Sequence, residues 1–284
     1  MSQELVSELP SEEELIHDWN SNGEHQWPAK PPSLIDHSVA CATVRWQSFE
    51  ELSVEQTVER SHQVLNALSQ LGIEGYQLGE WDAPATRDLM EQLLQQNKQS
   101  VNFGCELGSR PLIDQLQNEA QLETTSLRFY TSSRHPKFRQ HCQLARSGKV
   151  LVVQDCGWQQ PSELVEAVST AVEFGFEAIC LSDDTGRCLP SAATRLVSFV
   201  RDCLERRQPA SLKNQGLRIE WSGRNDRGMA LYTGLAAWKA GASVLHCAYL
   251  GIGEGAGLLS TELLLVNLSL IGCLQRDLSA LKNV

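Results

Sequence analysis

The sequence predicts an α/β fold, a closed (β/α)₈ TIM barrel that follows an acidic N-terminal extension. Apolar runs of strand length alternate with amphipathic stretches of helix length, and the alternation repeats eight times. Eight such units in a chain of this size are typical of a closed barrel. The first residues have a different composition, so we expect an acidic, Pro-rich arm over residues 1–32 and the barrel over residues 33–284.

Eight strand–helix units can be assigned along the chain from these patterns. Short apolar runs predict strands at 34–45, 75–79, 100–105, 126–131, 149–154, 177–182, 216–221 and 243–249. An apolar period near that of a helix predicts helices at 53–71, 84–97, 109–121, 135–147, 161–174, 190–207, 228–240 and 260–281.

Several predicted helices begin and end at residues with suitable chemistry. Ser53 precedes Gln56 by three residues, which is the pattern of a capping box. Proline stands in two first helical turns, at Pro161 and Pro190, where its missing N–H is not needed. Glycine follows three predicted helices and lets the chain turn, at Gly72, Gly175 and Gly241.

An open, doubly wound sheet is the alternative to a closed barrel. Such a sheet carries a glycine-rich phosphate loop after its first strand. Here the glycine-rich segment, Gly251-Ile-Gly-Glu-Gly-Ala256, follows the last predicted strand. That position favours a loop at the mouth of a barrel.

The composition disfavours several classes of protein. The net charge is −11, and residues 1–30 contain seven acidic residues against one lysine, so we expect no nucleic-acid partner. No apolar run is long enough to span a membrane, and the N-terminus lacks the pattern of a signal peptide. The nine cysteines have irregular spacing, which fits reduced thiols rather than a disulfide framework. These features predict a soluble cytoplasmic protein with no membrane partner.

The acidic arm has two interpretations. Its polar and Pro-rich composition is typical of a partly disordered extension. Alternatively, residues 12–19 form a short helix that docks on a partner subunit, with Leu15, Ile16 and Trp19 on one side. Trp19, Trp27 and the arm would then contribute to a homodimer contact.

Side chains that follow the strands of a barrel gather at its carboxyl-terminal mouth, where catalytic groups are found. These positions give a polar mouth with carboxylates, arginines and one histidine: Arg45, Trp46, Gln47, Gln77, Glu80, Cys105, Glu106, Thr131, Ser132, Arg134, His135, Asp155, Asp183, Asp184, Thr185, Ser222, Arg224, Asn225, Asp226, Tyr249 and Glu254. Cys188 and Cys247 lie near the mouth and are expected to be buried inert thiols. His246, inside the last strand, is expected to be a hydrogen-bonded core histidine.

The late part of the sequence carries a specific arrangement. Asn225-Asp226 and Gly228 follow the seventh predicted strand, and an Ala-rich helix ends at Gly241. The following loop contains Gly251, Gly253, Glu254, Ala256 and Gly257. This arrangement resembles the barrel of 2-isopropylmalate synthase, homocitrate synthase and hydroxymethylglutaryl-CoA lyase, the DRE-TIM metallolyase superfamily. Looser similarity extends over residues 34–272, and the regulatory domains of the synthases are not expected.

The resemblance implies a divalent metal at the mouth, but the ligand positions hold different residues. The two ligand histidines of the family are Ser222 and Arg224 here, and the ligand asparagine is Leu258. An arginine is always charged and repels a divalent cation. We therefore expect no metal and no cofactor. The Arg224 guanidinium would take the place of the cation, where it could pair with Asp184 or Asp226 or bind a carboxylate in fork geometry.

The fourth ligand of the family is the second aspartate of an Asp-x-Thr-Leu-Arg-Asp-Gly motif, which can be aligned in two registers. Matching Thr43-Val44-Arg45 keeps the arginine and places Trp46 at the ligand position. Matching Asp36 to the first aspartate replaces the arginine by Ala40 and places Cys41 there. We favour the first register, because it keeps a charged residue at the end of the strand.

We expect a metal-independent relative with carbon–carbon lyase or condensation-type chemistry. Its ligand would be a small carboxylate or carbonyl compound such as a 2-oxo acid, or an acyl thioester such as acyl-CoA. The candidate catalytic residues are Arg45, Asp184, Asp226 and Glu254, and the candidate substrate-binding residues are Arg224, Asn225, Thr185, Ser222, Gln77 and His135. The alternatives are an inactive pseudoenzyme that binds a ligand or a protein, and a metalloenzyme with rebuilt ligands.

Overall fold

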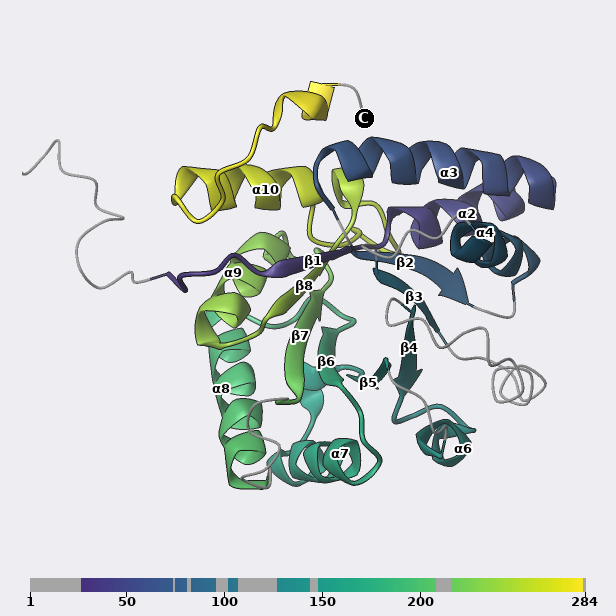
Figure 1. Cartoon of the computed structure of the whole chain (residues 1–284). Coiled ribbons are helices and arrows are strands. Elements are labelled where there is room, and N and C mark those ends of the chain that lie inside the picture. The colour runs from purple at the N-terminus through teal and green to yellow at the C-terminus, as the bar shows by residue number, and fades with distance from the viewer. Residues whose placement is uncertain are drawn as a thin grey trace, which may run out of the picture.

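Eight parallel strands form a closed barrel in sequence order, and β1 pairs with β8 to complete the ring (Figure 1). The structure, a computed structural model, describes residues 27–73, 75–80, 83–95, 102–106, 127–143, 148–207 and 216–282. The strands are β1 (Ser33–Asp36), β2 (Gly75–Glu80), β3 (Asn102–Glu106), β4 (Leu127–Ser132), β5 (Lys149–Val153), β6 (Ala178–Asp183), β7 (Arg218–Gly223) and β8 (Val244–Cys247). The fold predicted from the alternation of apolar patterns is therefore confirmed as TIM-barrel-like.

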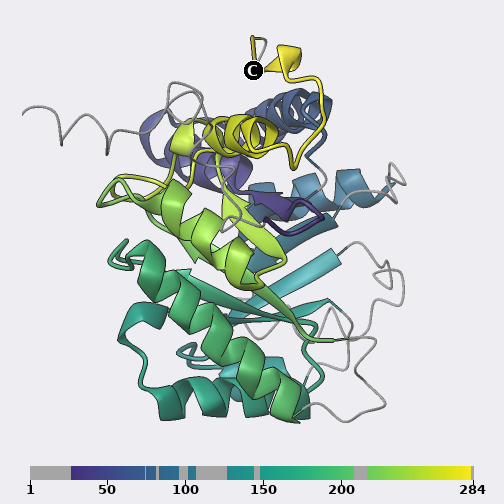
Figure 2. The same cartoon turned by 90° about the vertical axis from the view of Figure 1, so that its left-hand side faces the viewer.

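Helices surround the strands, as two perpendicular views show (Figure 1, Figure 2). They are α2 (Ser38–Phe49), α3 (Val54–Gln70), α4 (Pro84–Gln95), α6 (Phe138–Cys142), α7 (Pro161–Glu173), α8 (Pro190–Arg207), α9 (Ala230–Ala240) and α10 (Thr261–Leu270). Short 3₁₀ segments are η2 (Cys156–Trp158), η4 (Tyr249–Gly251) and η5 (Ser279–Lys282). Within the described residues no helix is long and apolar enough to cross a membrane.

Three predicted elements were wrong in extent. The helix predicted at 135–147 spans only Phe138–Cys142. The strand predicted at 34–45 ends at Asp36, and residues 38–49 are helical. The helix predicted at 260–281 ends at Leu270, because Gly272 takes a positive φ of 75° and turns the chain. The helix predicted at 109–121 and residues 1–26 of the arm, including its predicted helix at 12–19, lie outside the described residues.

The capping box and the glycines predicted to start or end helices are found at those positions in the structure. The Ser53 hydroxyl accepts from the amide of Gln56, and the Gln56 side chain accepts from the amide of Ser53. Gly72, Gly175 and Gly241 follow α3, α7 and α9 with φ of 69°, 65° and 121°, values that favour glycine. These residues fix where three of the outer helices start or stop.

The side chains of the strands alternate between the barrel interior and the surrounding helices. Trp221 and Leu245 face outward and pack in one cluster with Trp238 of α9. Ile35, Tyr130, Val150, Ala178, Cys180 and Val244 form a separate, smaller cluster inside the ring. A residue two positions along a strand from an interior residue therefore also faces the interior.

Basic side chains bind the last carbonyls of outer helices, at the amino-terminal end of the barrel. The Lys149 ammonium donates to the Phe174 carbonyl at 2.6 Å, at the end of α7. Arg201 Nη1 donates to the Ala240 carbonyl at 2.7 Å, and Arg276 Nη1 donates to the Leu71 carbonyl at 2.7 Å. Cations at helix C-termini satisfy free carbonyls and interact favourably with the helix dipole.

Trp27 packs on the chain's own helix α9. Its ring stacks on Trp238 with the centroids 5.4 Å apart, and the Lys239 ammonium lies 5.7 Å from its ring centroid. The segment that enters β1 is thus anchored to the barrel from Trp27 onward. This contact engages a residue that the sequence suggested for a homodimer contact.

Candidate functional site

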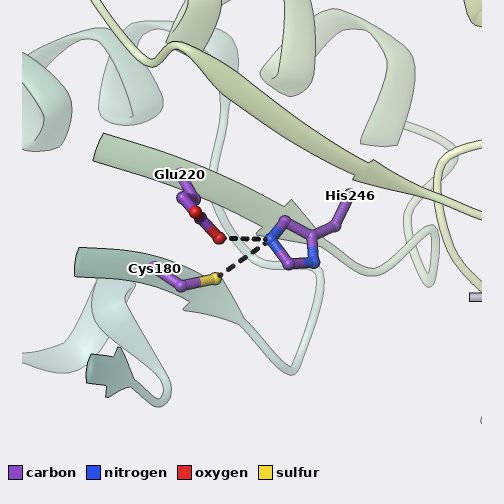
Figure 3. A group of neighbouring side chains, drawn as sticks. All are labelled: Cys180, Glu220 and His246. Carbon is purple, nitrogen blue, oxygen red and sulfur yellow. Dashed lines mark hydrogen bonds and ion pairs between the residues drawn. The ribbon is translucent and has the colours of Figure 1, made fainter. Parts of the chain in front are cut away.

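A buried polar network lies inside the barrel at half height. Cys180 of β6 and Glu220 of β7 are register partners in neighbouring strands, and His246 lies on the adjacent β8 (Figure 3). His246 Nε2 lies 2.9 Å from Glu220 Oε2 and 3.7 Å from Cys180 Sγ. All three side chains are buried, so these contacts replace hydration.

Arg128 and Tyr130 of β4 complete the surroundings of Glu220. Arg128 Nη2 donates to Glu220 Oε1 in a buried ion pair, and the Tyr130 hydroxyl donates to Glu220 Oε2 at 3.3 Å. Burial alone would raise the pKa of Glu220, but the hydrogen bond to His246 and the Arg128 charge hold that pKa below its ordinary value. Glu220 is therefore a carboxylate paired with a cation.

His37 extends the network toward the mouth from the end of β1. Its Nε2 lies 2.7 Å from Nδ1 of His246, and the two rings are tilted with centroids 4.9 Å apart. Burial, and then the neighbouring His246, lower the pKa of His37 well below the ordinary value for histidine. His37 is therefore a neutral imidazole whose orientation His246 fixes.

Three atoms of this network form a possible set of metal ligands. The sulfur of Cys180, a carboxylate oxygen of Glu220 and a ring nitrogen of His246 lie within 4.8 Å of one another. A thiolate, an imidazole and a carboxylate are ligands that Zn²⁺ accepts. This set is one layer deeper than the mouth, since Glu220 stands two residues before Ser222 on β7.

Arg224 lies at the mouth beyond β7, at a position where the sequence resemblance implies a metal ligand. Its Nε lies 3.0 Å from Asp226 Oδ2 and its Nη1 lies 3.3 Å from Glu254 Oε2. The backbone of Arg224 bridges to Leu258, and the Arg224 guanidinium lies so close to Gly255 that a side chain at that position would clash with it. The Arg224 cation and the alkyl side chain of Leu258 at these positions do not fit a divalent metal.

The first strand ends earlier than the sequence predicted, which affects the alignment of its motif. Arg45 was predicted to follow the strand, but it is an exposed residue in the second half of α2. Asp36 ends β1 and is buried, with Ser38 N donating to its Oδ1 at 2.8 Å and the Thr261 hydroxyl donating to its Oδ2 at 2.6 Å. The register that starts at Asp36 agrees with this strand end, and in that register the resemblance implies Cys41, rather than Trp46, at the ligand position.

Asp184 lies in a second polar group at the mouth, after β6. The Ser182 hydroxyl donates to its Oδ1 at 2.6 Å, and the amide of Asp155 donates to its Oδ2 at 2.9 Å. Asp155 in turn pairs with Arg134 at 2.6 Å. Asp184 is thus held by neutral donors, while Asp226 and Glu254 are paired with Arg224.

The remaining predicted binding residues are dispersed. Asn225 caps α9, because its Oδ1 accepts from Ala230 N at 3.2 Å. Thr185 is exposed, and Ser222 is half-buried at the end of β7. His135 stacks on His141 beside α6 with the centroids 4.6 Å apart. Gln77 is buried in β2, and its Oε1 has no hydrogen-bond partner among the described residues.

The interior network was not predicted, apart from a hydrogen-bonded His246. A signal was present, because Arg128, Glu220 and His246 each stand within a short apolar strand. A charged residue inside a buried strand needs a partner, so two such residues of opposite sign indicate an interior ion pair.

Two comparisons relate the chain to known sequences. The HMGL-like family model matches residues 119–282, more than half of the chain. The 2-isopropylmalate synthases of Salinibacter ruber and Sediminispirochaeta smaragdinae are 36% identical over 104 residues and 33% identical over 115 residues. These matches cover 37% and 40% of this chain but only 18% and 22% of the synthases. A 4-hydroxy-2-oxovalerate aldolase of Spirochaeta aurantia is 29% identical over 109 residues, which is 38% of this chain and 29% of the aldolase.

Solved structures share the fold over nearly the whole chain. An HMG-CoA lyase of Acinetobacter baumannii, in complex with coenzyme A and 3-methylmalate, has a TM-score of 0.66 and 17% identity and covers 91% of this chain and 90% of its own. The HMG-CoA lyase of Bacillus subtilis has a TM-score of 0.63 and 15% identity and covers 91% of both chains. At this level of identity the similarity concerns the fold.

Proposed function

Because the chain belongs to the HMGL-like family, we propose that it is a carbon–carbon lyase or condensation-type enzyme without a metal at its mouth. Its substrate would be a small carboxylate such as a 2-oxo acid, or an acyl thioester. The matched relatives are named as synthases and aldolases of such compounds, and one structure of similar fold holds coenzyme A and 3-methylmalate. The named activities support the class of reaction that we propose.

This proposal rests on the two ion pairs of Arg224, whose partners differ in how firmly they are held. Its inner partner, Asp226, also accepts from the amide of Ala256 at 3.1 Å and is held in the loop. Its outer partner, Glu254, has a side chain that is 90% exposed. An exposed ion pair contributes only about 0–1 kcal/mol, so a substrate carboxylate can displace Glu254 and bind the same guanidinium.

Asp184 is the best-placed group for proton transfer at the mouth. Unlike Asp226 and Glu254, it is bound by a hydroxyl and an amide rather than by a cation. A carboxylate that keeps a free lone pair near the substrate can act as a general base, and its protonated form as a general acid. In this proposal Arg224 orients the carboxylate and Asp184 moves the proton.

The alternative function is that of a pseudoenzyme that binds a ligand or a protein. The ion pairs of Arg224 favour this alternative, because Asp226 and Glu254 together balance the charge of Arg224 without any ligand. The two functions differ in turnover rather than in binding.

The proposal is tested with two substitutions of opposite expected effect. Arg224→Gln should weaken binding of 2-oxoisovalerate or pyruvate by about 10- to 100-fold, because hydrogen bonds to charged groups contribute about 1.5–3 kcal/mol. Glu254→Gln should tighten it by up to about fivefold, since it removes a competitor worth about 0–1 kcal/mol. Binding is measured by calorimetry on the full chain.

Arg227→Gln is the matched control, because Arg227 is an exposed arginine of the same loop that bonds the Arg187 carbonyl. It should leave the affinity unchanged. Weaker binding in Glu254→Gln, or equal losses in the Arg224 and Arg227 variants, would contradict the proposed carboxylate site. Release of free thiol from acetyl-CoA mixed with each 2-oxo acid then reports condensation, and binding without any turnover would favour the pseudoenzyme.

A further inference from the structure

We propose that Cys180, Glu220 and His246 bind a thiophilic divalent cation, best matched by Zn²⁺, in the interior of the barrel. Figure 3 shows the three side chains. The set lies one layer below the mouth and shares no residue with the carboxylate site proposed above. It is also distinct from the positions where the family resemblance implies a metal, which hold Cys41, Ser222, Arg224 and Leu258.

The distances already approach those of a tetrahedral site. Bond lengths of about 2.3 Å to sulfur and 2.0–2.1 Å to nitrogen or oxygen imply about 3.5 Å between sulfur and nitrogen and about 3.3 Å between nitrogen and oxygen. The observed separations are 3.7 Å for Cys180 Sγ to His246 Nε2 and 2.9 Å for His246 Nε2 to Glu220 Oε2. The third separation, from Cys180 Sγ to the Glu220 carboxylate oxygen, is within 4.8 Å. Metal binding would therefore open the second distance by a few tenths of an ångström and draw the sulfur and the carboxylate oxygen toward about 3.5 Å, which side-chain rotation can supply.

The surroundings hold the three ligands in place. Cys180 and Glu220 lie opposite each other on paired strands, so the sheet fixes the distance between their Cα atoms. His37 contacts Nδ1 of His246 at 2.7 Å, an outer hydrogen bond of the kind that fixes the ring orientation of metal-binding histidines. Arg128 engages Oε1 of Glu220 and leaves Oε2 directed at His246.

The charges of the site predict the fourth ligand. Binding replaces the Cys180 S–H bond by a sulfur–metal bond and releases that proton to solvent. The divalent cation, the thiolate, the Glu220 carboxylate and the Arg128 guanidinium together leave one positive charge in a buried place. An anion such as hydroxide or a carboxylate would neutralise it. Ser182 and Ser222, paired in the next layer toward the mouth, offer a polar approach for that ligand.

The ligand types select the metal. A thiolate and an imidazole favour Zn²⁺, and they also accept Co²⁺ as a spectroscopic substitute, whereas Mg²⁺ and Ca²⁺ prefer oxygen ligands only. The full chain purified under reducing conditions should therefore contain about one equivalent of zinc by elemental analysis. Replacing that zinc by Co²⁺ should give a near-ultraviolet sulfur-to-cobalt charge-transfer band and the strong visible bands of a tetrahedral ion.

Cys180→Ser should remove the charge-transfer band, and Cys41→Ser should keep it. The Cys41 variant is the matched control because Cys41 stands at the position where the family resemblance implies a metal. The wild-type cobalt spectrum is informative even if the Cys180 variant does not fold, because the band itself reports a thiolate ligand. Failure of the wild type to bind either metal, or a band that survives in Cys180→Ser and is lost in Cys41→Ser, would overturn the inference. None of these readouts depends on carboxylate binding at Arg224.

Discussion

At the scale of single residues, Asp36 is a buried carboxylate held by neutral donors. Burial raises its pKa above the ordinary 3.8, although the hydrogen bonds from Ser38 and Thr261 act in the opposite direction. The pKa in the folded protein is therefore higher than in the unfolded chain. The free energy of unfolding falls as the pH rises from 3.8 through the folded-state pKa, because folding then costs the burial of a charge.

Substitution of Asp36 should separate the charge from the hydrogen bonds. Asp36→Asn keeps an acceptor for Ser38 and should be at least as stable as the wild type at pH 7. Asp36→Leu leaves the Ser38 amide and the Thr261 hydroxyl without their acceptor and should lose about 1–3 kcal/mol. Urea denaturation between pH 4 and pH 7 measures both, and the gain of Asp36→Asn over the wild type should grow with pH. A gain that shrinks with rising pH would contradict the assigned direction of the pKa shift.

Which site residues could be predicted depends on where they lie along the strands. Arg224, Asp226 and Glu254 come from loops after strands, and the rule that such loops converge predicts their contact. Arg45 was misplaced because the end of β1 was set nine residues too late. Cys180 and Glu220 could not be paired in advance, because their contact depends on the register between β6 and β7.

At the scale of elements, α3 was predicted within one residue and α2 was missed. The ends of α3 are encoded locally by a capping box and by Gly72. The sequence of α2 is rich in Val, Thr and Cys, which are weak helix formers. Its start is set by tertiary contacts instead, since Ser38 N bonds Asp36 and the Ser38 hydroxyl accepts from Tyr249 N at 2.7 Å. Contacts between distant segments overrode local preference there.

The N-terminal cap of α3 should make a measurable contribution to the free energy of unfolding. Ser53→Ala removes the acceptor of the Gln56 amide and should lower the free energy of unfolding by about 1 kcal/mol. Ser53→Gly should lower the free energy of unfolding by only a few tenths of that amount, since glycine is itself tolerated at this position. Ser69→Ala is the control, because Ser69 is an exposed residue near the other end of α3 whose hydroxyl bonds only the Asn66 carbonyl. A loss in the control equal to that of Ser53→Ala would show that the cap is not the cause.

At the scale of the whole molecule, the repeat of eight units was sufficient to predict the barrel. The repeat is a property of the chain, whereas the interior network results from ring closure. Closure brings residues 128, 180, 220 and 246 together from four different strands. A pattern of one strand cannot report its partners across the ring, so the interior chemistry needed the structure.

We propose that residues 33–284 are the barrel domain and that the anchoring of the chain begins at Trp27. A chain without residues 1–26 should melt at the same temperature as the full chain. Removal of residues 1–32 should lower the melting temperature by about 2–6 °C, because it also deletes the stack of Trp27 on Trp238. Calorimetry and light scattering on the same samples test both points. A halved mass without residues 1–26 would assign a homodimer contact to the arm, and an unchanged mass would count against it.

The basic residues at the amino-terminal end of the barrel affect which parts of the chain can change without loss of the fold. Lys149, Arg201 and Arg276 bind helix carbonyls at the opposite end from Arg224 and Asp184. Contacts that secure the scaffold are therefore spatially separate from contacts that touch a ligand. Mutations at the mouth can therefore change its binding and catalytic groups without unfolding the protein. The same separation makes the mouth loops suitable for directed evolution of new specificities.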